Sequence, residues 1–197
     1  MRKSEQFVIP YTDLNAVNTK ESKAWNFVYE WMDSLVFAFI TILLVFTFLF
    51  RIVGVKGTSM VPTLQNGNWL AVRAINTEIQ RGDIVVVTQP NALNEPIIKR
   101  VIGLSGDKIN INFETGEVTV NGTVLNEPYI AEPTHHRFDV TFPVTVPPGC
   151  VFVMGDNRND SLDSRSSVIG FIDCGYILGV AEFRIIPFGD WKIDTNA

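Results

Sequence analysis

The chain has little that would support a metal site, nucleic-acid binding or histidine-dependent catalysis. Its 197 residues include only two cysteines and two histidines. Cys150 and Cys174 do not form a C-x-x-C motif, and so few ligands at such wide spacing do not indicate a zinc site. The net charge is −5, and no run of lysine and arginine stands out. We therefore expect no metal, no other cofactor and no nucleic-acid partner.

Two motifs of common hydrolases are also missing. The sequence has no H-E-x-x-H pattern, which argues against a zinc peptidase of that type. It has no G-x-S-x-G elbow either, and Ser105 in the similar stretch "GLSGD" is better explained as a turn residue between two strands. His135 and His136 lie side by side in the polar stretch "EPTHHRF", which is typical of a solvated surface. A histidine base is therefore not favoured.

The sequence does contain one long apolar run. Residues 35–50 carry no charge, and Thr41 and Thr47 are their only polar members. At about 1.5 Å per residue, a helix over 34–55 would cross a hydrocarbon core of about 30 Å. The run starts too far from the N-terminus for a signal peptide, and it lacks the polar face of a core helix. We predict a transmembrane helix over 34–55, preceded by an N-terminal tail, residues 1–33.

From residue 56 the pattern changes to short β-type runs separated by turn signals. Asn121-Gly122 is the strongest short hairpin signal, and it lies inside the candidate hairpin 116–126. No long helical period follows residue 56. We predict a mainly β fold, an antiparallel β-rich catalytic domain over 56–197 behind one N-terminal transmembrane helix. The other candidate strands are 68–75, 83–88, 96–103, 108–112, 150–156 and 176–186.

Ser59 and Lys99 could supply a nucleophile and a base. Ser59 lies in "GTSMVPTL", shortly after the apolar run, and a catalytic serine needs a base within hydrogen-bond reach. In a strand over 96–103, Lys99 would have apolar neighbours on its own face. Burial can lower a lysine pKa by about 3–5 units, which is enough to bring it near 7. Arg100 stays protonated and cannot be the base, and in an arbitrary strand both charges would simply extend into solvent.

Four motifs, taken together, favour a catalytic role for Ser59 and Lys99. In order they read "GTSMVPTLQNGN", "RGDIVVV", "IIKRVIGLSGDKI" and "GDNRNDSLDSR". They resemble the conserved boxes of bacterial type I signal peptidases, the membrane-bound Ser/Lys proteases that remove signal peptides from exported proteins. The resemblance extends from the apolar run to about Ala181. The short stretch between Lys99 and Asp156 is similar to the compact Gram-positive form of the family.

The resemblance implies a role for each matching residue. Ser59 would be the nucleophile, its backbone N–H would serve the oxyanion hole, Lys99 would be the general base and Ser161 would orient the lysine. Some family members have a second hydroxyl donor where this chain has Gly57, so the second oxyanion donor is open. The residues implied to support the site are Met60, Pro62, Asp156, Asn157, Arg158, Asp163, Ser164 and Arg165.

The resemblance also implies a substrate and a location. It implies cleavage of secretory preproteins after small residues, A-x-A, in shallow apolar pockets that we expect near Met60 and Val85–Val87. It implies a single-pass protein of the cell membrane, with the N-terminus in the cytoplasm and the catalytic domain outside, where association with the export machinery is expected. The flanking charges are balanced and do not give the orientation. An extracytoplasmic domain would permit a disulfide between Cys150 and Cys174, which sequence spacing neither requires nor excludes.

Two other hypotheses stay open at this point. A membrane-anchored β-rich binding module would carry Ser59 and Lys99 as ordinary residues and would tolerate Ser59→Ala. A self-cleaving repressor with a Ser/Lys pair would need a DNA-binding N-terminal domain, and the apolar run and the short, acidic tail argue against that.

Overall fold

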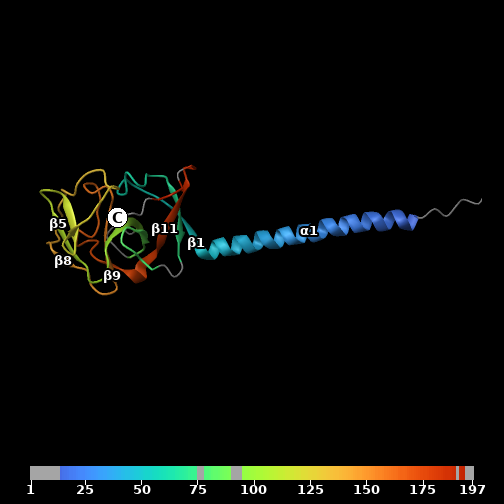
Figure 1. Ribbon diagram of the computed structural model, residues 1–197, viewed down its shortest axis with the longest axis horizontal. Coiled ribbons are helices and arrows are strands. Elements are labelled where there is room, and N and C mark those ends of the chain that lie inside the picture. The colour runs from blue at the N-terminus through green and yellow to red at the C-terminus, as the bar shows by residue number, and fades with distance from the viewer. Residues whose placement is uncertain (1–13, 75–77, 90–94, 190, 194–197) are drawn as a thin grey trace, which may run out of the picture. The chain divides into compact units, whose positions relative to one another are not determined.

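The computed structural model describes residues 14–74, 78–89, 95–189 and 191–193. The chain divides into two compact units, with the boundary between Thr47 and Phe48. The first unit contains the helix α1, Leu14–Leu49, and the second is a β-rich domain (Figure 1).

Helix α1 contains a segment that is long and apolar enough to cross a membrane, Phe27–Leu44, none of which is buried. The two threonine hydroxyls of the apolar run donate hydrogen bonds to backbone oxygens one turn earlier. Thr41 bonds to Phe37 at 2.8 Å and Thr47 to the preceding turn at 2.7 Å. These bonds satisfy the hydroxyl groups within the helix, which lowers the cost of placing them in lipid.

The helix of the structure has other bounds than the transmembrane helix predicted over 34–55. The helix begins at Leu14, inside the expected tail, and residues 1–13 lie outside the described residues. It ends at Leu49, and Phe50–Gly54 forms the strand β1, which pairs with β2. Apolar content alone does not distinguish a helix from a strand, and pairing with a partner distant in sequence decided the structure of β1.

The domain consists of two antiparallel sheets. The larger has the order β1-β2-β11-β3-β4-β9-β10 and the smaller the order β7-β6-β5-β8. The strands of the larger sheet are β1, β2 (Trp69–Arg73), β3 (Ile84–Val87), β4 (Ile97–Gly103), β9 (Cys150–Met154), β10 (Ile172–Asp173) and β11 (Ile177–Ile186). The smaller sheet contains β5 (Lys108–Asn112), β6 (Glu117–Val120), β7 (Thr123–Val124) and β8 (Val144–Thr145).

These pairings confirm the predicted mainly β, antiparallel fold. Each predicted strand is present within a few residues of its expected bounds, and β1, β8 and β10 were not predicted. The predicted hairpin joins β6 to β7, with Asn121 at φ 53° and Gly122 at φ 82°. Two successive positive φ values are typical of a type I′ turn, which explains the Asn-Gly pair.

The core positions strand β4 deep inside the domain. Every residue of β3 is fully buried, with Val85 and Val87 in one apolar cluster and Ile84 and Val86 in another. Strand β4 pairs with β3 on one side and with β9 on the other. Six of the seven residues of β4 are buried, Lys99 and Arg100 among them.

The cysteines lie close to each other in this arrangement but are not joined. Cys150 begins β9 and Cys174 directly follows β10, and these two strands pair. Both are free thiols, and burial raises the pKa of Cys174.

Candidate active site

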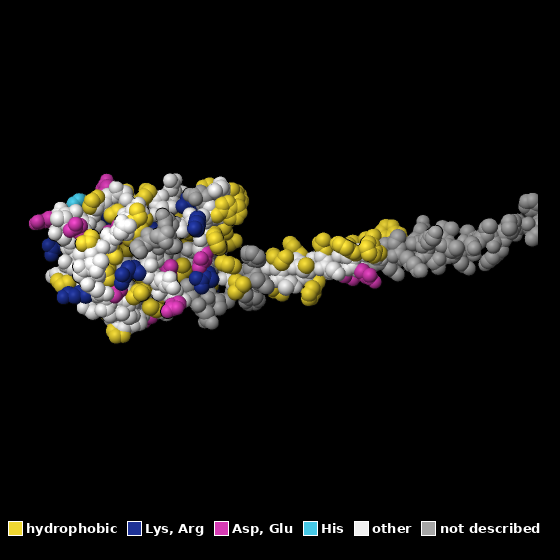
Figure 2. All heavy atoms as spheres, viewed as in Figure 1, with side chains coloured by type: hydrophobic (Ala, Val, Ile, Leu, Met, Phe, Trp, Pro, Cys, Tyr) yellow, Lys and Arg dark blue, Asp and Glu magenta, His cyan; other side chains and the backbone are white. Residues whose placement is uncertain are grey.

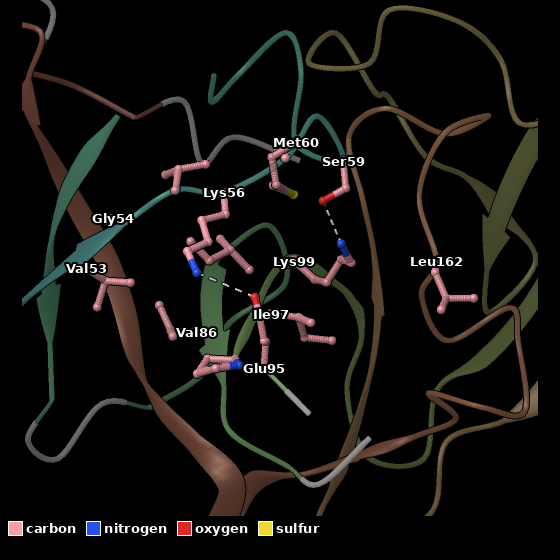
Figure 3. A pocket seen from close by; sticks show the side chains of 14 residues that line it. Val53, Gly54, Lys56, Ser59, Met60, Val86, Glu95, Ile97, Lys99 and Leu162 are labelled. Carbon is pink, nitrogen blue, oxygen red and sulfur yellow. Dashed lines mark hydrogen bonds and ion pairs between the residues drawn. The ribbon is translucent and has the colours of Figure 1, made fainter. Parts of the chain in front are cut away.

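The site begins with a contact between the two residues singled out in the sequence. Lys99 Nζ lies 2.7 Å from Ser59 Oγ, although 40 residues separate them in the chain. Lys99 extends from β4, and Ser59 lies in the turn that follows β1; their side chains point toward each other (Figure 3). A hydroxyl this close to a neutral amine can transfer its proton to it.

Burial prepares Lys99 to act as a base. The residue is 4% exposed, and the strand register places it opposite Val85. Burial lowers the pKa of Lys99 to about 8; the Asp163 carboxylate opposes this change, the Arg165 guanidinium adds to it and the Asp156 carboxylate opposes it. The amine therefore loses its proton near neutral to mildly alkaline pH instead of above pH 10.

The turn that carries the serine is fixed by its own backbone. Gly57 has φ 84°, a left-handed conformation that glycine adopts without strain. The Val61 N–H then donates to the Thr58 carbonyl at 3.0 Å. Met60 is 2% exposed and packs into the core, and the peptide bond before Pro62 is cis. Ser59 thus lies in a hydrogen-bonded turn next to a buried anchor.

The segment after β9 holds the same turn from outside. The Asn157 N–H donates to the Ser59 carbonyl at 3.0 Å, and its side-chain amide donates to the Thr58 carbonyl at 3.2 Å. The Thr58 hydroxyl donates to the Asp160 carboxylate at 2.7 Å. Gly155 lies so close that a Cβ atom would come within 2.4 Å of the Ser59 carbonyl oxygen. Only glycine allows this approach, which places the end of β9 directly behind Ser59.

A buried ion pair connects β4 to the serine turn. Arg100 and Asp156 are fully buried and meet through two hydrogen bonds of 2.8 and 2.7 Å. The Thr63 hydroxyl donates to the same carboxylate at 2.5 Å, and the guanidinium lies 3.9 Å from the centre of the Tyr129 ring. Arg100 therefore does not extend into solvent, and Asp156 ties both elements of the dyad together.

A second buried pair lies beside Lys99. Arg165 and Asp163 are fully buried, with Nε 2.8 Å from Oδ1. The Ser161 hydroxyl donates to Asp163 at 2.9 Å, and the Ser164 hydroxyl accepts a backbone N–H of β9 at 3.0 Å. Within the described residues, Ser161 makes no hydrogen bond to Lys99; it bonds to Asp163, whose carboxylate acts on Lys99 through its charge.

Arg158 supports the site from further away. Its guanidinium is buried and lies 2.6 Å from Glu127, and it also donates to the Thr134 hydroxyl at 2.9 Å.

The sequence did not reveal several partners of the site residues, because each lies far along the chain from the residue that it contacts. These partners are Thr58, Thr63, Arg100, Glu127, Tyr129, Thr134, Gly155 and Asp160. The clearest sequence signal for such a contact was Arg100, since an arginine in a buried strand requires a carboxylate partner.

The histidines are exposed, as expected, and face other groups. The His135 ring contacts the Phe113 carbonyl and the His136 ring contacts the Asn159 carbonyl, each at 3.1 Å. Within the described ranges, neither histidine bonds to Ser59, and no group of three or more His, Cys, Asp and Glu side chains could hold a metal ion.

The dyad opens into a cleft of about 680 Å³. One wall consists of Val53–Gly57 together with the serine turn, and the other consists of Glu95–Lys99. Val86 and Leu162 complete the lining (Figure 3). Met60 and Val86 therefore lie where substrate pockets were expected, whereas Val85 and Val87 pack into the core instead.

A family model described as "Signal peptidase, peptidase S26" matches residues 28–186. The chain belongs to this family. A signal peptidase I of Bacillus licheniformis is 37% identical over 182 residues, covering 87% of this chain and 95% of the relative. A probable signal peptidase I-1 of Synechocystis is 36% identical, covering 88% and 90%.

A crystal structure of a signal peptidase I from Enterococcus faecalis V583 is 31% identical, with a TM-score of 0.44, and covers 53% of this chain and 97% of that chain. Membership in the peptidase S26 family makes the chain a hydrolase, a serine endopeptidase that cleaves signal peptides from preproteins.

Proposed function

We propose that Ser59 and Lys99 form the catalytic dyad of this peptidase and that it cleaves preproteins after small residues, A-x-A. The observation that carries the proposal is the 2.7 Å contact between a hydroxyl and a buried lysine whose pKa is lowered to about 8. A binding module has no need of such a contact, because keeping an amine buried and neutral costs stability.

The geometry supports a complete acyl-transfer cycle. Neutral Lys99 accepts the Ser59 proton while Oγ attacks the substrate carbonyl, and the Ser59 backbone N–H stabilises the oxyanion that forms. The Lys99 ammonium then protonates the leaving amine as the peptide bond breaks. Water attacks the resulting ester and gives a proton to Lys99. Lys99 returns this proton to Ser59 Oγ as the acyl bond breaks, so the acid product leaves and both side chains are restored. The Thr58 hydroxyl is bonded to Asp160, which leaves backbone donors as the better source of a second oxyanion contact.

Two open strand edges lie beside the dyad. Among the described residues, strand β1 is at the edge of its sheet, where it pairs with β2, and the pairing of β4 with β9 begins at Arg100. An extended peptide can therefore add hydrogen bonds to the edge of Ile97–Lys99 and to the end of β1. Alternate side chains of such a peptide face the cleft. The small, apolar lining around Val53, Met60, Val86 and Ile98 fits alanine at positions −1 and −3.

An apolar surface supports a position at the membrane. The register places Ile52 and Phe183 in one cross-strand row, with Ala71 between them, and Trp69 beside Ile186 in the next. Figure 2 shows hydrophobic side chains gathered at this end of the domain. The exposed large side chains there are Ile52, Trp69, Phe183, Ile186, Phe188 and Trp191. Exposed aromatic and aliphatic patches of this kind contact lipid or protein.

With this surface and α1, we place the protein in the cell membrane as a single-pass protein. Its N-terminus lies in the cytoplasm and its catalytic domain on the outside, where preproteins emerge from the export machinery. Residues 56–197 then form the catalytic domain. This topology brings the dyad to the side of the bilayer on which a substrate's cleavage site appears.

The cleavage site tests the specificity directly. A preprotein whose signal ends in A-x-A is incubated with the full-length protein in detergent, and the products are sized by mass spectrometry. We expect one cut after the second alanine. Replacing the −1 or the −3 alanine with phenylalanine should reduce kcat/KM by at least about 100-fold, because the shallow cleft excludes the ring. Equal cleavage of all three substrates would contradict the proposed specificity.

The pH dependence tests the base. Below pH 8, the neutral fraction of Lys99 falls about tenfold per pH unit, so kcat/KM for the A-x-A substrate should rise tenfold per unit and level off above about pH 8. Between about pH 8 and pH 10.5, Lys99 binds fewer protons in the folded chain than in the unfolded chain. Through this group, the free energy of unfolding therefore increases with pH in that range. A rate independent of pH from about 6 to 10 would rule out Lys99 as the base.

A further inference from the structure

An ion pair connects the two walls of the cleft next to the dyad. Lys56 lies on the wall that leads into the serine turn, and Glu95 lies on the opposite wall, just before β4. Lys56 Nζ is 3.7 Å from Glu95 Oε2. Figure 3 shows this contact running from one wall to the other, near the hydrogen bond between Ser59 and Lys99.

The pair differs from the other charged groups of the site. The side chains of Lys56 and Glu95 are 83% and 63% exposed, whereas Arg100, Asp156, Asp163 and Arg165 are fully buried. The buried groups are held in fixed positions by several hydrogen bonds each. For an exposed ion pair, the equilibrium favours the paired over the separated side chains by about fivefold at most. Substrate binding can therefore open it.

A peptide in the cleft places particular side chains at this pair. If the side chains at −1 and −3 point to the apolar lining, the side chain at −2 points to the opposite side, toward the rim. Lys56 and Glu95 both belong to the cleft lining and reach into solvent there. A side chain at −2 would meet an ammonium from one wall and a carboxylate from the other.

From this arrangement, and resting on the proposed function, we infer that Lys56 and Glu95 are specificity-determining residues that read the charge of the substrate residue at position −2. With both present, an acidic −2 side chain pairs with Lys56 and a basic one with Glu95, and each replaces the contact between Lys56 and Glu95. The wild type then accepts both signs about equally. Removal of one member should leave an enzyme that prefers the charge opposite to the member that remains.

The experiment uses full-length protein in detergent and three A-x-A peptides that differ only at −2, with Glu, Gln or Lys. The readout is the ratio of kcat/KM for the Glu peptide to that for the Lys peptide. For wild type we expect a ratio within about twofold of one. For Lys56→Met the ratio should fall about two- to fivefold, and for Glu95→Gln it should rise by a similar factor. Both changes should shrink at about 1 M salt, where the Debye length is about 3 Å.

Two control variants correct for the change in net charge. Lys108 and Glu114 are exposed residues that do not line the cleft. Lys108→Met and Glu114→Gln make the same changes in charge and should leave the ratio as in wild type. The exchange variant Lys56→Glu/Glu95→Lys keeps both charges on the rim and should return the ratio to near one.

The results separate this inference from the proposed function. If wild type cleaves the Gln peptide after the −1 alanine but both single variants keep the wild-type ratio, or both shift it in the same direction, the rim pair does not read charge and the proposed function stands. The inference is also wrong if the two control variants shift the ratio as much as the rim variants do. If wild type cleaves none of the three peptides, the proposed function fails and the inference fails with it.

Discussion

Replacing Ser59 with alanine should reduce kcat/KM for an A-x-A preprotein by at least about 1000-fold. The substitution removes the oxygen that would form the acyl-enzyme, and only the oxyanion donors and substrate binding would remain. Replacing Lys99 with methionine should have an effect of the same size. Methionine fills much the same buried space 2.7 Å from the serine but cannot accept its proton. The measurement is product formation per enzyme, followed by mass spectrometry.

Two further variants make this result specific to the dyad. Ser59→Ala/Lys99→Met should be no less active than either single variant, because residues that act as a unit do not contribute additively. Ser105→Ala also removes a serine hydroxyl, one that accepts from the Gly149 N–H and donates to the Cys150 carbonyl away from the cleft. It should retain wild-type activity. Appreciable cleavage by folded Ser59→Ala would disprove the proposed dyad.

The sequence was sufficient to single out Ser59 and Lys99, which the structure brings into contact, but not the residues that hold them in place. Alternation along β4 predicted that Lys99 and Arg100 point to opposite faces, and in the structure both side chains are buried. Which carboxylate would pair with which arginine could not be predicted. Arg100 meets Asp156, which is 56 positions away, and this contact exists only once β4, β9 and the serine turn come together.

The β1 boundary shows a related limit. An apolar run has the same composition whether it lies in lipid or in the edge of a sheet, so the sequence placed Phe50–Gly54 in the helix. The structure pairs these residues with β2, a partner that local pattern does not identify. Two short strands were not predicted for a simpler reason: β8 and β10 have two residues each, which is too few to show any alternation. The Asn121-Gly122 hairpin was predictable because its signal is entirely local.

Replacing Asp156 with asparagine should give the largest loss of stability among single changes near the site. The substitution keeps the shape of the side chain but removes the negative charge that faces the fully buried Arg100 guanidinium. A buried charge deprived of its partner typically destabilises a protein by about 3–5 kcal/mol. The Thr63 hydroxyl also loses its carboxylate acceptor, which loosens the serine turn, so activity should fall together with stability. Denaturant unfolding of the full-length protein in detergent measures the change.

A surface pair provides the matched control. Glu182 contacts Arg73 at 2.6 Å, but their side chains are 30% and 43% exposed, so Glu182→Gln should cost at most about 1 kcal/mol. The double variant Arg100→Met/Asp156→Leu should recover part of the loss of Asp156→Asn, because it removes both charges from the core. If Asp156→Asn is no more destabilising than Glu182→Gln, the buried pair is not what joins β4 to the serine turn. In that case the Asn157 and Gly155 contacts alone position the nucleophile against Lys99.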